Sequence, residues 1–205
     1  MLKNPDAEAR ESAAQAICVA NFRGYATERD MEEVKRGDET CRAALATIAA
    51  GNLQFREVAD KCRALLIPAF NDEANRVREA AARCFHKISD ERLCSEAQLI
   101  DSFLNSLAFR EHAHILLAAL EKAVHRLPDV VLKIPEKAVK IHQKKNSGEA
   151  MESHWWTNEM ANLVLRLYEQ TPDPHVKTRC LDALDKMIEF DLGNTTTELA
   201  KLERA

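Results

Sequence analysis

Glu111, His112 and His114 form the densest group of residues that could hold a metal ion. Imidazole nitrogens and carboxylates are common zinc ligands in proteins. On a helix, however, residues two positions apart point in nearly opposite directions, so His112 and His114 cannot both reach one ion. We therefore expect an ordinary helix surface with one half-buried imidazole, and no metal or cofactor.

The six cysteines offer no better chemistry. None forms a C-x-x-C pair, and Cys41, Cys62, Cys84 and Cys180 fall on apolar helical faces, where cysteine acts as a small hydrophobe. Cys84 and His86 lie two positions apart and therefore on different faces. The glycines are isolated, which argues against a phosphate-binding loop. We expect reduced thiols, a cytoplasmic protein and no enzyme.

Two stretches are candidates for binding rather than catalysis. Lys133, Lys137, Lys140 and Lys144 would share one side of short helices. This strip is either a docking site for an acidic protein segment or nucleic acid, or a solvated face. Trp155, at the start of a later helix, is less committed to the core than Trp156. It is either an interface anchor or packs on the preceding repeat.

Composition sets the limits within which these residues act. The chain has 205 residues, a net charge of -4, and only five glycines and six prolines. Abundant Ala and Leu without β-branched runs predict an all-α protein. The charge gives no general attraction to nucleic acid or to anionic membranes. No apolar run reaches the roughly 18 residues of a membrane span, so we expect neither a span nor a signal peptide.

Helical segments alternate with short turns along the chain. Pro68 is expected to end the helix that precedes it, because proline disfavours helix in the residue before it. Pro128 and Pro135 are expected to cut the next stretch into two short pieces. Gly51 suits a helix C′ position with positive φ. Residues 146–149 predict a loop, and Thr195 with Glu198 predict a capping box.

One amphipathic pattern recurs through the chain and is clearest at residues 71–88. Val77, Ala81, Cys84, Phe85 and Ile88 share one helical face there. The helical part of this pattern starts at residue 77, and similar segments start at residues 9, 41, 109, 139 and 176, so successive starts are about 30–37 residues apart. A period in this range is typical of stacked helix pairs, which bury a shared core.

The turn with Asp72, followed by Val77, Arg78 and small and large apolar residues, resembles the second helix of HEAT repeats, relatives of armadillo repeats. A second match begins at Asp173, with Lys177 in place of the arginine, and a looser one at Asp6. The resemblance implies a ladder of ion pairs between neighbouring repeats. Asp72 with Arg78, and Asp6 with Arg10, would supply it.

The fold we predict is an all-α, right-handed α-solenoid of about six HEAT-like helix pairs. It would form a single repeat domain over residues 1–205, irregular at 128–152. The first helix presents Ala13, Ile17 and Val19 without a covering helix. We therefore expect either a piece of a longer solenoid or self-association through this helix.

The resemblance also implies a non-catalytic interaction or scaffold module that binds a protein segment on its concave face. The predicted contacts are second-helix positions off the core: Arg76, Glu79, Arg83, His112, Lys177 and Asp182.

Two alternative functions remain open. Residues 165–174 resemble the C-terminal helical arrays of large bacterial signalling NTPases of the STAND type, where the array senses a ligand. A nucleic-acid-binding HEAT-like solenoid is the other alternative, which the overall acidity disfavours.

Overall fold

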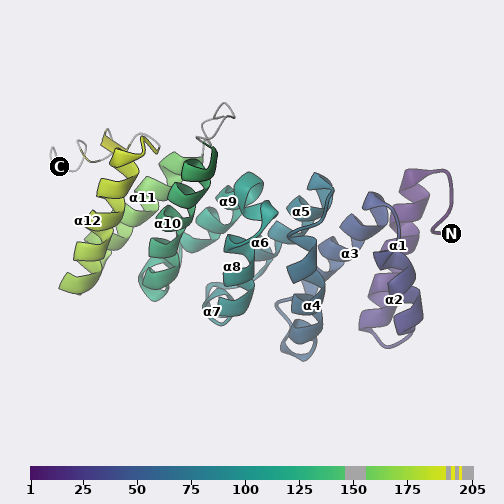
Figure 1. Cartoon of the computed structure of the whole chain (residues 1–205). Helices are drawn as coiled ribbons and strands as arrows, with labels where there is room; N and C mark the ends of the chain where they lie inside the picture. The colour runs from purple at the N-terminus through teal and green to yellow at the C-terminus, as the bar shows by residue number, and fades with distance from the viewer. Residues whose placement is uncertain (146–155, 193–194, 197–198, 200–205) are drawn as a thin grey trace. The chain divides into compact units, whose positions relative to one another are not determined.

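The computed structural model describes residues 1–145, 156–192, 195–196 and 199, and these residues are helical with short connections (Figure 1). The predicted loop at 146–149 and the Glu198 half of the capping box lie outside the described residues. The α-helices are α1 (Ala7–Phe22), α2 (Glu28–Lys35), α3 (Glu39–Asn52), α4 (Ala59–Ala69), α5 (Asn75–Ala82), α6 (Cys84–Lys87), α7 (Asp90–Cys94), α8 (Ala97–Leu104), α9 (Leu107–Leu120), α10 (Pro128–Lys145), α11 (Trp156–Gln170) and α12 (Pro174–Glu189).

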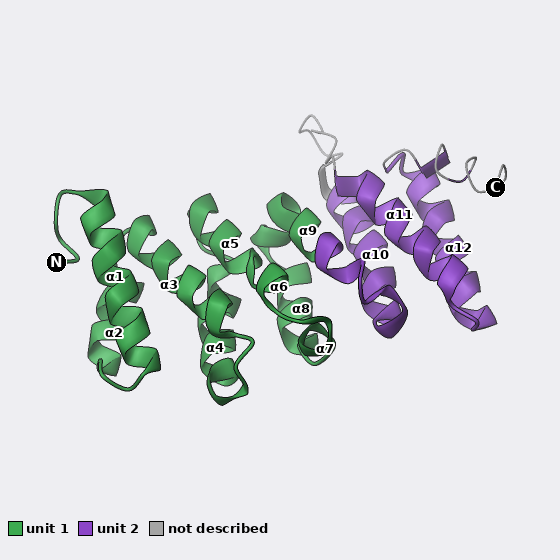
Figure 2. Cartoon of the chain, turned by 180° about the vertical axis from the view of Figure 1, so that it is seen from behind, with its two compact units in different colours: residues 1–116 green, residues 117–205 purple. Residues whose placement is uncertain are grey.

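The chain divides into two compact units, residues 1–116 and 117–205, and the boundary falls inside α9 (Figure 2). Each unit is an array of packed helices without a strand among the described residues, which confirms the predicted all-α solenoid class. The right-handed superhelix and the single domain over 1–205 stay predictions.

In unit 1, α1, α3 and α5 pack side by side in a row, and α2 and α4 pack against that row. The recurring pattern at 71–88 forms α5 and α6, with Val77, Ala81, Cys84 and Phe85 buried as predicted. Phe85 belongs to an aromatic cluster around Phe103, whose ring centroid lies 5.0 Å from that of Phe85 and 5.2 Å from that of Phe70. Edge-to-face contacts of this kind add to the stability gained by burial.

In unit 2, α10, α11 and α12 pack against one another. The core side of α11 follows the predicted spacing, and Trp156, Met160, Leu163 and Leu167 are buried. These residues recur every three or four positions and therefore occupy one stripe of the helix.

Three local predictions about helix ends are wrong. Pro68 lies inside α4, and Pro135 lies inside a single long α10. Gly51 lies within α3, and among the described glycines the one with positive φ is Gly24, at 78°. In each case the buried apolar stripe continues beyond the expected stop: Leu53 follows Gly51, Phe70 follows Pro68, and Ala138 follows Pro135. Packing of this stripe outweighs the local cost of the breaker.

Three arginines at equivalent positions link successive helices of unit 1. The Nε atoms of Arg10, Arg42 and Arg78 donate to a carboxylate about 30 residues further along the chain. Their acceptors are Asp38 at 2.7 Å, Asp72 at 2.8 Å and Glu111 at 2.7 Å. The Nη1 atom of each arginine donates to a backbone carbonyl in the turn before its own helix. One planar guanidinium therefore joins two turns.

The predicted ladder exists, but the predicted partners are wrong. Arg78 contacts the carbonyl oxygen of Asp72 at 2.6 Å, whereas the Asp72 carboxylate binds Arg42 of the preceding repeat. Asp6 accepts from the backbone N–H of Glu8 and caps α1. The reach of the arginine side chain explains the difference, because its far nitrogens extend past the turn of its own helix to the next one.

A second link ties α4 to the start of α8. The carboxylate of Glu96 is fully buried and accepts from Arg63 at 2.8 Å, with Arg92 Nη2 2.6 Å away. A buried carboxylate requires such partners, because its desolvation is otherwise very costly. The helical periodicity gave no sign of this group.

We predict that Asp72→Ala lowers the free energy of unfolding by about 2 kcal/mol, because it removes the carboxylate that accepts two hydrogen bonds from the largely buried Arg42 side chain. The Asp72 and Arg42 side chains are 14% and 22% exposed. Asp60→Ala is the matched control: Asp60 pairs with Arg63 but is 97% exposed, so about 0.5 kcal/mol or less is expected. Urea unfolding measures both, and equal losses would contradict a structural role for the ladder.

The ladder also predicts sensitivity to acid. Burial opposes ionisation of Asp72, but hydrogen bonds from Arg42 and the Ala74 N–H outweigh it, so its pKa is lowered. The hydrogen bond from the Cys41 N–H is the main cause that lowers the pKa of Asp38. Ionised Asp72 therefore stabilises the fold above its unfolded pKa of about 4, and this contribution is lost as pH falls through the folded pKa.

The stability difference between the wild type and Asp72→Asn should accordingly be largest near neutral pH and shrink toward pH 3. Urea midpoints measured across that range test the expectation. A difference that stays constant with pH would show that the charge of Asp72 does not contribute.

Candidate interaction surfaces

The row α1–α3–α5 carries three of the predicted contact residues: Arg76, Glu79 and Arg83. At its centre α3 is rich in alanine, with Ala43, Ala46 and Ala50 nearly or fully buried. Such small side chains let neighbouring helices approach closely. Arg76 Nη2 on α5 lies 2.7 Å from Glu11 Oε2 on α1, so this pair bridges over α3. Side chains therefore cover the middle of the row.

Two of the predicted contacts on α5 pair with each other. Arg83 Nη2 lies 2.6 Å from Glu79 Oε1 one turn earlier, and both side chains are exposed. An exposed pair of this kind is weak, and a partner could displace it. Arg76, which is half-exposed, has a similar character.

His112 is misplaced by the sequence prediction, which put it at a helix position off the core. The residue is only 7% exposed, and its Nε2 lies 2.6 Å from Asn75 Oδ1. The backbone of His112 departs from helical geometry, with φ of -125°, and this kink in α9 turns the ring inward. Burial is the main cause that lowers the pKa of His112. A buried neutral imidazole does not offer a contact surface.

The predicted lysine strip lies on one continuous helix rather than two. Lys133 and Lys140 of α10 are exposed and Lys137 is half-buried. The side chain of Lys144 and all of Trp155 lie outside the described residues. The three described lysines recur at intervals of four and three residues and therefore share one side of α10.

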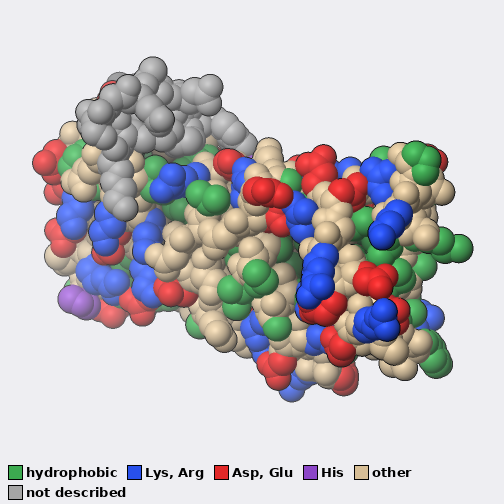
Figure 3. Space-filling view, turned by 45° about the vertical axis from the view of Figure 1, so that its right-hand side comes forward, with side chains coloured by type: hydrophobic (Ala, Val, Ile, Leu, Met, Phe, Trp, Pro, Cys, Tyr) green, Lys and Arg blue, Asp and Glu red, His purple; other side chains and the backbone are tan. Residues whose placement is uncertain are grey.

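Asp182 of α12 lies at a pocket beside α10, the helix that carries the strip. A pocket of about 100 Å³ lies between α10 and α12, lined by Leu132, Pro135, Glu136, Arg179, Asp182, Ala183 and Lys186. Arg179 Nη1 lies 2.7 Å from Asp129 Oδ1 across the two helices. Figure 3 shows Lys and Arg side chains gathered on this part of unit 2, with acidic side chains between them. We call the surface formed by Lys133, Lys137 and Lys140 of α10 and by Arg179, Asp182 and Lys186 of α12 the α10–α12 face.

Lys177 does not join that face. Its Nζ lies 5.3 Å from the ring centroid of Tyr168 on α11, a cation–π contact. Sequence reasoning missed Arg179 and Lys186, although they lie three positions before and four positions after Asp182. The helical spacing was visible in the sequence, but the pairing of α12 with α10 was not.

The described residues hold no group of three or more His, Cys, Asp or Glu side chains that could bind a metal ion. None of the described helices combines the length and apolar character needed to cross a membrane. All six cysteines are free thiols, as predicted, and five of them are buried. Burial is the main cause that raises the pKa of Cys18 and of Cys62 to about 11. A thiol in that state is a poor nucleophile.

Cys94 is the half-buried exception, so we predict that an aromatic disulfide reagent labels one thiol rapidly in the native protein and six after denaturation. Cys94→Ser should remove the rapid phase and leave the circular dichroism spectrum unchanged. Several thiols that react at similar rates in the native protein would contradict the described core.

Comparison with known proteins adds one match. Residues 63–91 match the model of the HEAT repeat family, and this range contains most of the 71–88 pattern. No curated protein and no solved structure matches the chain. The match supports neither the resemblance to signalling NTPases nor any particular partner. Together with the all-helical arrays of both units, it supports a HEAT-like helical repeat family for this chain.

Proposed function

We propose that this protein is a non-catalytic interaction module that binds an acidic segment of a partner protein on the α10–α12 face. HEAT repeats commonly serve as scaffolds for protein interactions. The observation that carries the proposal is the strip of Lys133, Lys137 and Lys140 on α10, together with Arg179 and Lys186 of α12, which line the pocket between these two helices.

The spacing of the strip suits an extended chain. Lys133 and Lys137 lie about 6 Å apart along the helix axis, at 1.5 Å per residue. Alternate side chains of an extended peptide point to one side and are separated by about 6.6 Å. A segment with acidic residues at alternate positions therefore places successive carboxylates near successive ammonium groups.

The acidic residues on the same face favour a protein partner over nucleic acid. Asp129, Glu136 and Asp182 lie among the basic residues, and the chain carries a net charge of -4. A continuous row of phosphates would meet these carboxylates at close range, whereas a peptide can place neutral residues opposite them. Nucleic-acid binding thus remains the competing outcome of the test.

The other predictions from the sequence stay proposals. The six free thiols fit the reducing conditions of the cytoplasm. No observation on the described residues favours the ligand-sensing array of a signalling NTPase. Association through α1 and contact through Trp155 or Lys144 stay predictions from the sequence.

Fluorescence anisotropy with two labelled probes tests the proposal: a twelve-residue peptide of alternating Glu and Ser, and a twelve-nucleotide single-stranded DNA. We expect the full chain to bind the peptide more tightly than the DNA. The triple variant Lys133→Glu/Lys137→Glu/Lys140→Glu should bind the peptide at least tenfold more weakly.

The control variant, Lys3→Glu/Arg29→Glu/Arg56→Glu, makes the same charge change at exposed positions of unit 1. Its affinity for the peptide should stay within about twofold of the wild type. An equal loss in both variants would show a response to net charge alone, and tighter binding of the DNA would favour the nucleic-acid alternative. Either result would overturn the proposal.

A further inference from the structure

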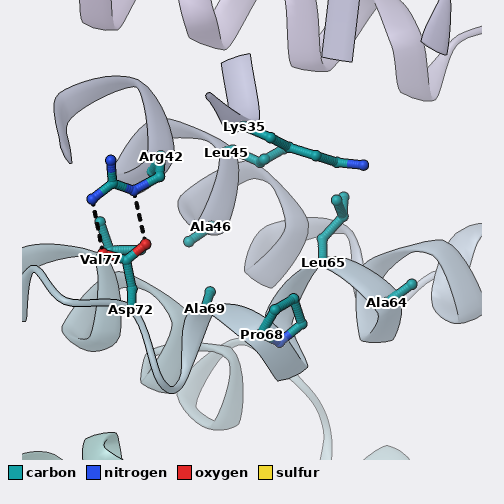
Figure 4. Close-up of a pocket in the computed structure, with 10 residues that line it drawn as sticks. All are labelled: Lys35, Arg42, Leu45, Ala46, Ala64, Leu65, Pro68, Ala69, Asp72 and Val77. Carbon is teal, nitrogen blue, oxygen red and sulfur yellow. Dashed lines mark hydrogen bonds and ion pairs between the residues drawn. The ribbon is translucent and has the colours of Figure 1, made fainter. Parts of the chain in front are cut away.

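A groove in unit 1 opens between the outer helices α2 and α4, with α3 and α5 beneath it (Figure 4). Its volume is about 250 Å³. The lining is mainly apolar and comprises Leu45, Ala46, Ala64, Leu65, Pro68, Ala69 and Val77, together with Lys35, Arg42 and Asp72. None of the contact residues expected from the sequence lies here.

Small side chains keep the groove open. Ala46 and Val77 at its floor are each 1% exposed and belong to the packed core. Ala64 and Pro68 on the α4 wall are exposed, so the groove faces solvent along this edge. Ordinary aliphatic residues at the alanine positions would fill this space.

Pro68 gives the α4 wall a hydrogen-bond acceptor. A proline inside a helix has no N–H to donate to the carbonyl four residues earlier, which here belongs to Ala64. Ala64 and Pro68 both line the groove. The Ala64 carbonyl oxygen therefore lacks its regular helical donor, and a backbone N–H of a bound peptide could take that donor's place.

The charged residues that line the groove differ in how strongly other side chains bind them. Arg42 and Asp72 at one end bind each other at 2.8 Å and belong to the arginine ladder. Lys35 on the other side pairs with Glu32, at 2.7 Å, and these side chains are 39% and 49% exposed. An exposed pair one turn apart is worth little, so a carboxylate from outside can take the place of Glu32.

The volume of the groove indicates which kind of ligand it can bind. Sites for small molecules usually have volumes of about 300–1,000 Å³ and enclose most of the ligand. This groove is smaller and open along one edge, which suits one or two aliphatic side chains that belong to a longer chain. Anchors of this kind supply much of the binding energy in protein interfaces.

We propose that the groove between α2 and α4 binds a peptide segment of a partner protein through one leucine-sized side chain and an adjacent carboxylate. The apolar side chain occupies the space above Ala46 and Val77. The N–H of the segment donates to the Ala64 carbonyl, and the carboxylate pairs with Lys35. This site is separate from the α10–α12 face and does not depend on it.

Selection from a displayed library of random twelve-residue peptides against the full chain tests the proposal. The enriched peptides should carry Leu, Ile or Met beside Asp or Glu. Their affinities are then measured by anisotropy with the synthetic peptide that is most enriched. Failure to enrich any peptide, or enrichment without this apolar–acidic pair, would overturn the proposal.

Ala64→Trp fills the groove from an exposed helix position and should weaken binding at least tenfold. Ala16→Trp is the matched control, because Ala16 is also exposed on a helix but lies on α1, outside the groove. Its affinity should stay within about twofold of the wild type. Equal affinity of the Ala64→Trp and Ala16→Trp variants would contradict the site.

Charge provides the second test. Lys35→Glu should weaken the selected peptide about fivefold, and a peptide with Lys in place of its acidic residue should recover the loss. The triple lysine variant of α10 should bind the selected peptide as the wild type does. Loss of binding in that variant would place the peptide on the α10–α12 face and overturn the groove proposal.

Discussion

The guanidinium of Arg42 connects two turns of unit 1 through three residues. It donates to the carbonyl of Gly37 before its own helix, to the carboxylate of Asp72 before α5, and to the neighbouring Glu73. Arg78 makes the same two-bond fork with Glu111 one repeat later, whereas Arg10 makes a single bond to Asp38 one repeat earlier. Because a fork fixes both distance and angle, each arginine sets how one helix pair lies against the next. The close approach of Gly37 belongs to the same turn, since a Cβ there would lie 2.6 Å from that of Cys41.

The two helices that contain an internal proline both border a groove. Pro68 and Ala64 line the groove beside α4, and Pro135 and Leu132 line the pocket beside α10. A proline inside a helix costs a hydrogen bond and is retained only where packing holds the helix on both sides of it. It also leaves the carbonyl four residues earlier without its regular helical donor. Local rules are often violated at functional sites, which agrees with placing both proposed binding surfaces at these prolines.

Sequence patterns predicted correctly the features that depend on a single helix, such as which of its side chains are buried. The spacing of Val77, Ala81, Cys84 and Phe85 predicted their burial, and it also marked the repeat that the family model matches. It was wrong for Gly51, Pro68 and Pro135, because their local preference is overridden by contacts with other helices. Partners at a distance were also missed. Arg42 with Asp72, and Arg63 with Glu96, join helices whose relative position no single segment specifies.

The contacts expected on the concave face and the observed grooves differ because of how the helices of unit 1 pack against one another. The alanines of α3 bring α1 and α5 close enough for Glu11 and Arg76 to meet above it, so the inner row is covered by its own side chains. On the outer side, α2 and α4 pack against that row, and the space between them is not filled by larger residues. Close packing of α1, α3 and α5 on one side of unit 1 thus comes with a gap between α2 and α4 on the other side. The mainly apolar groove of unit 1 therefore lies between α2 and α4.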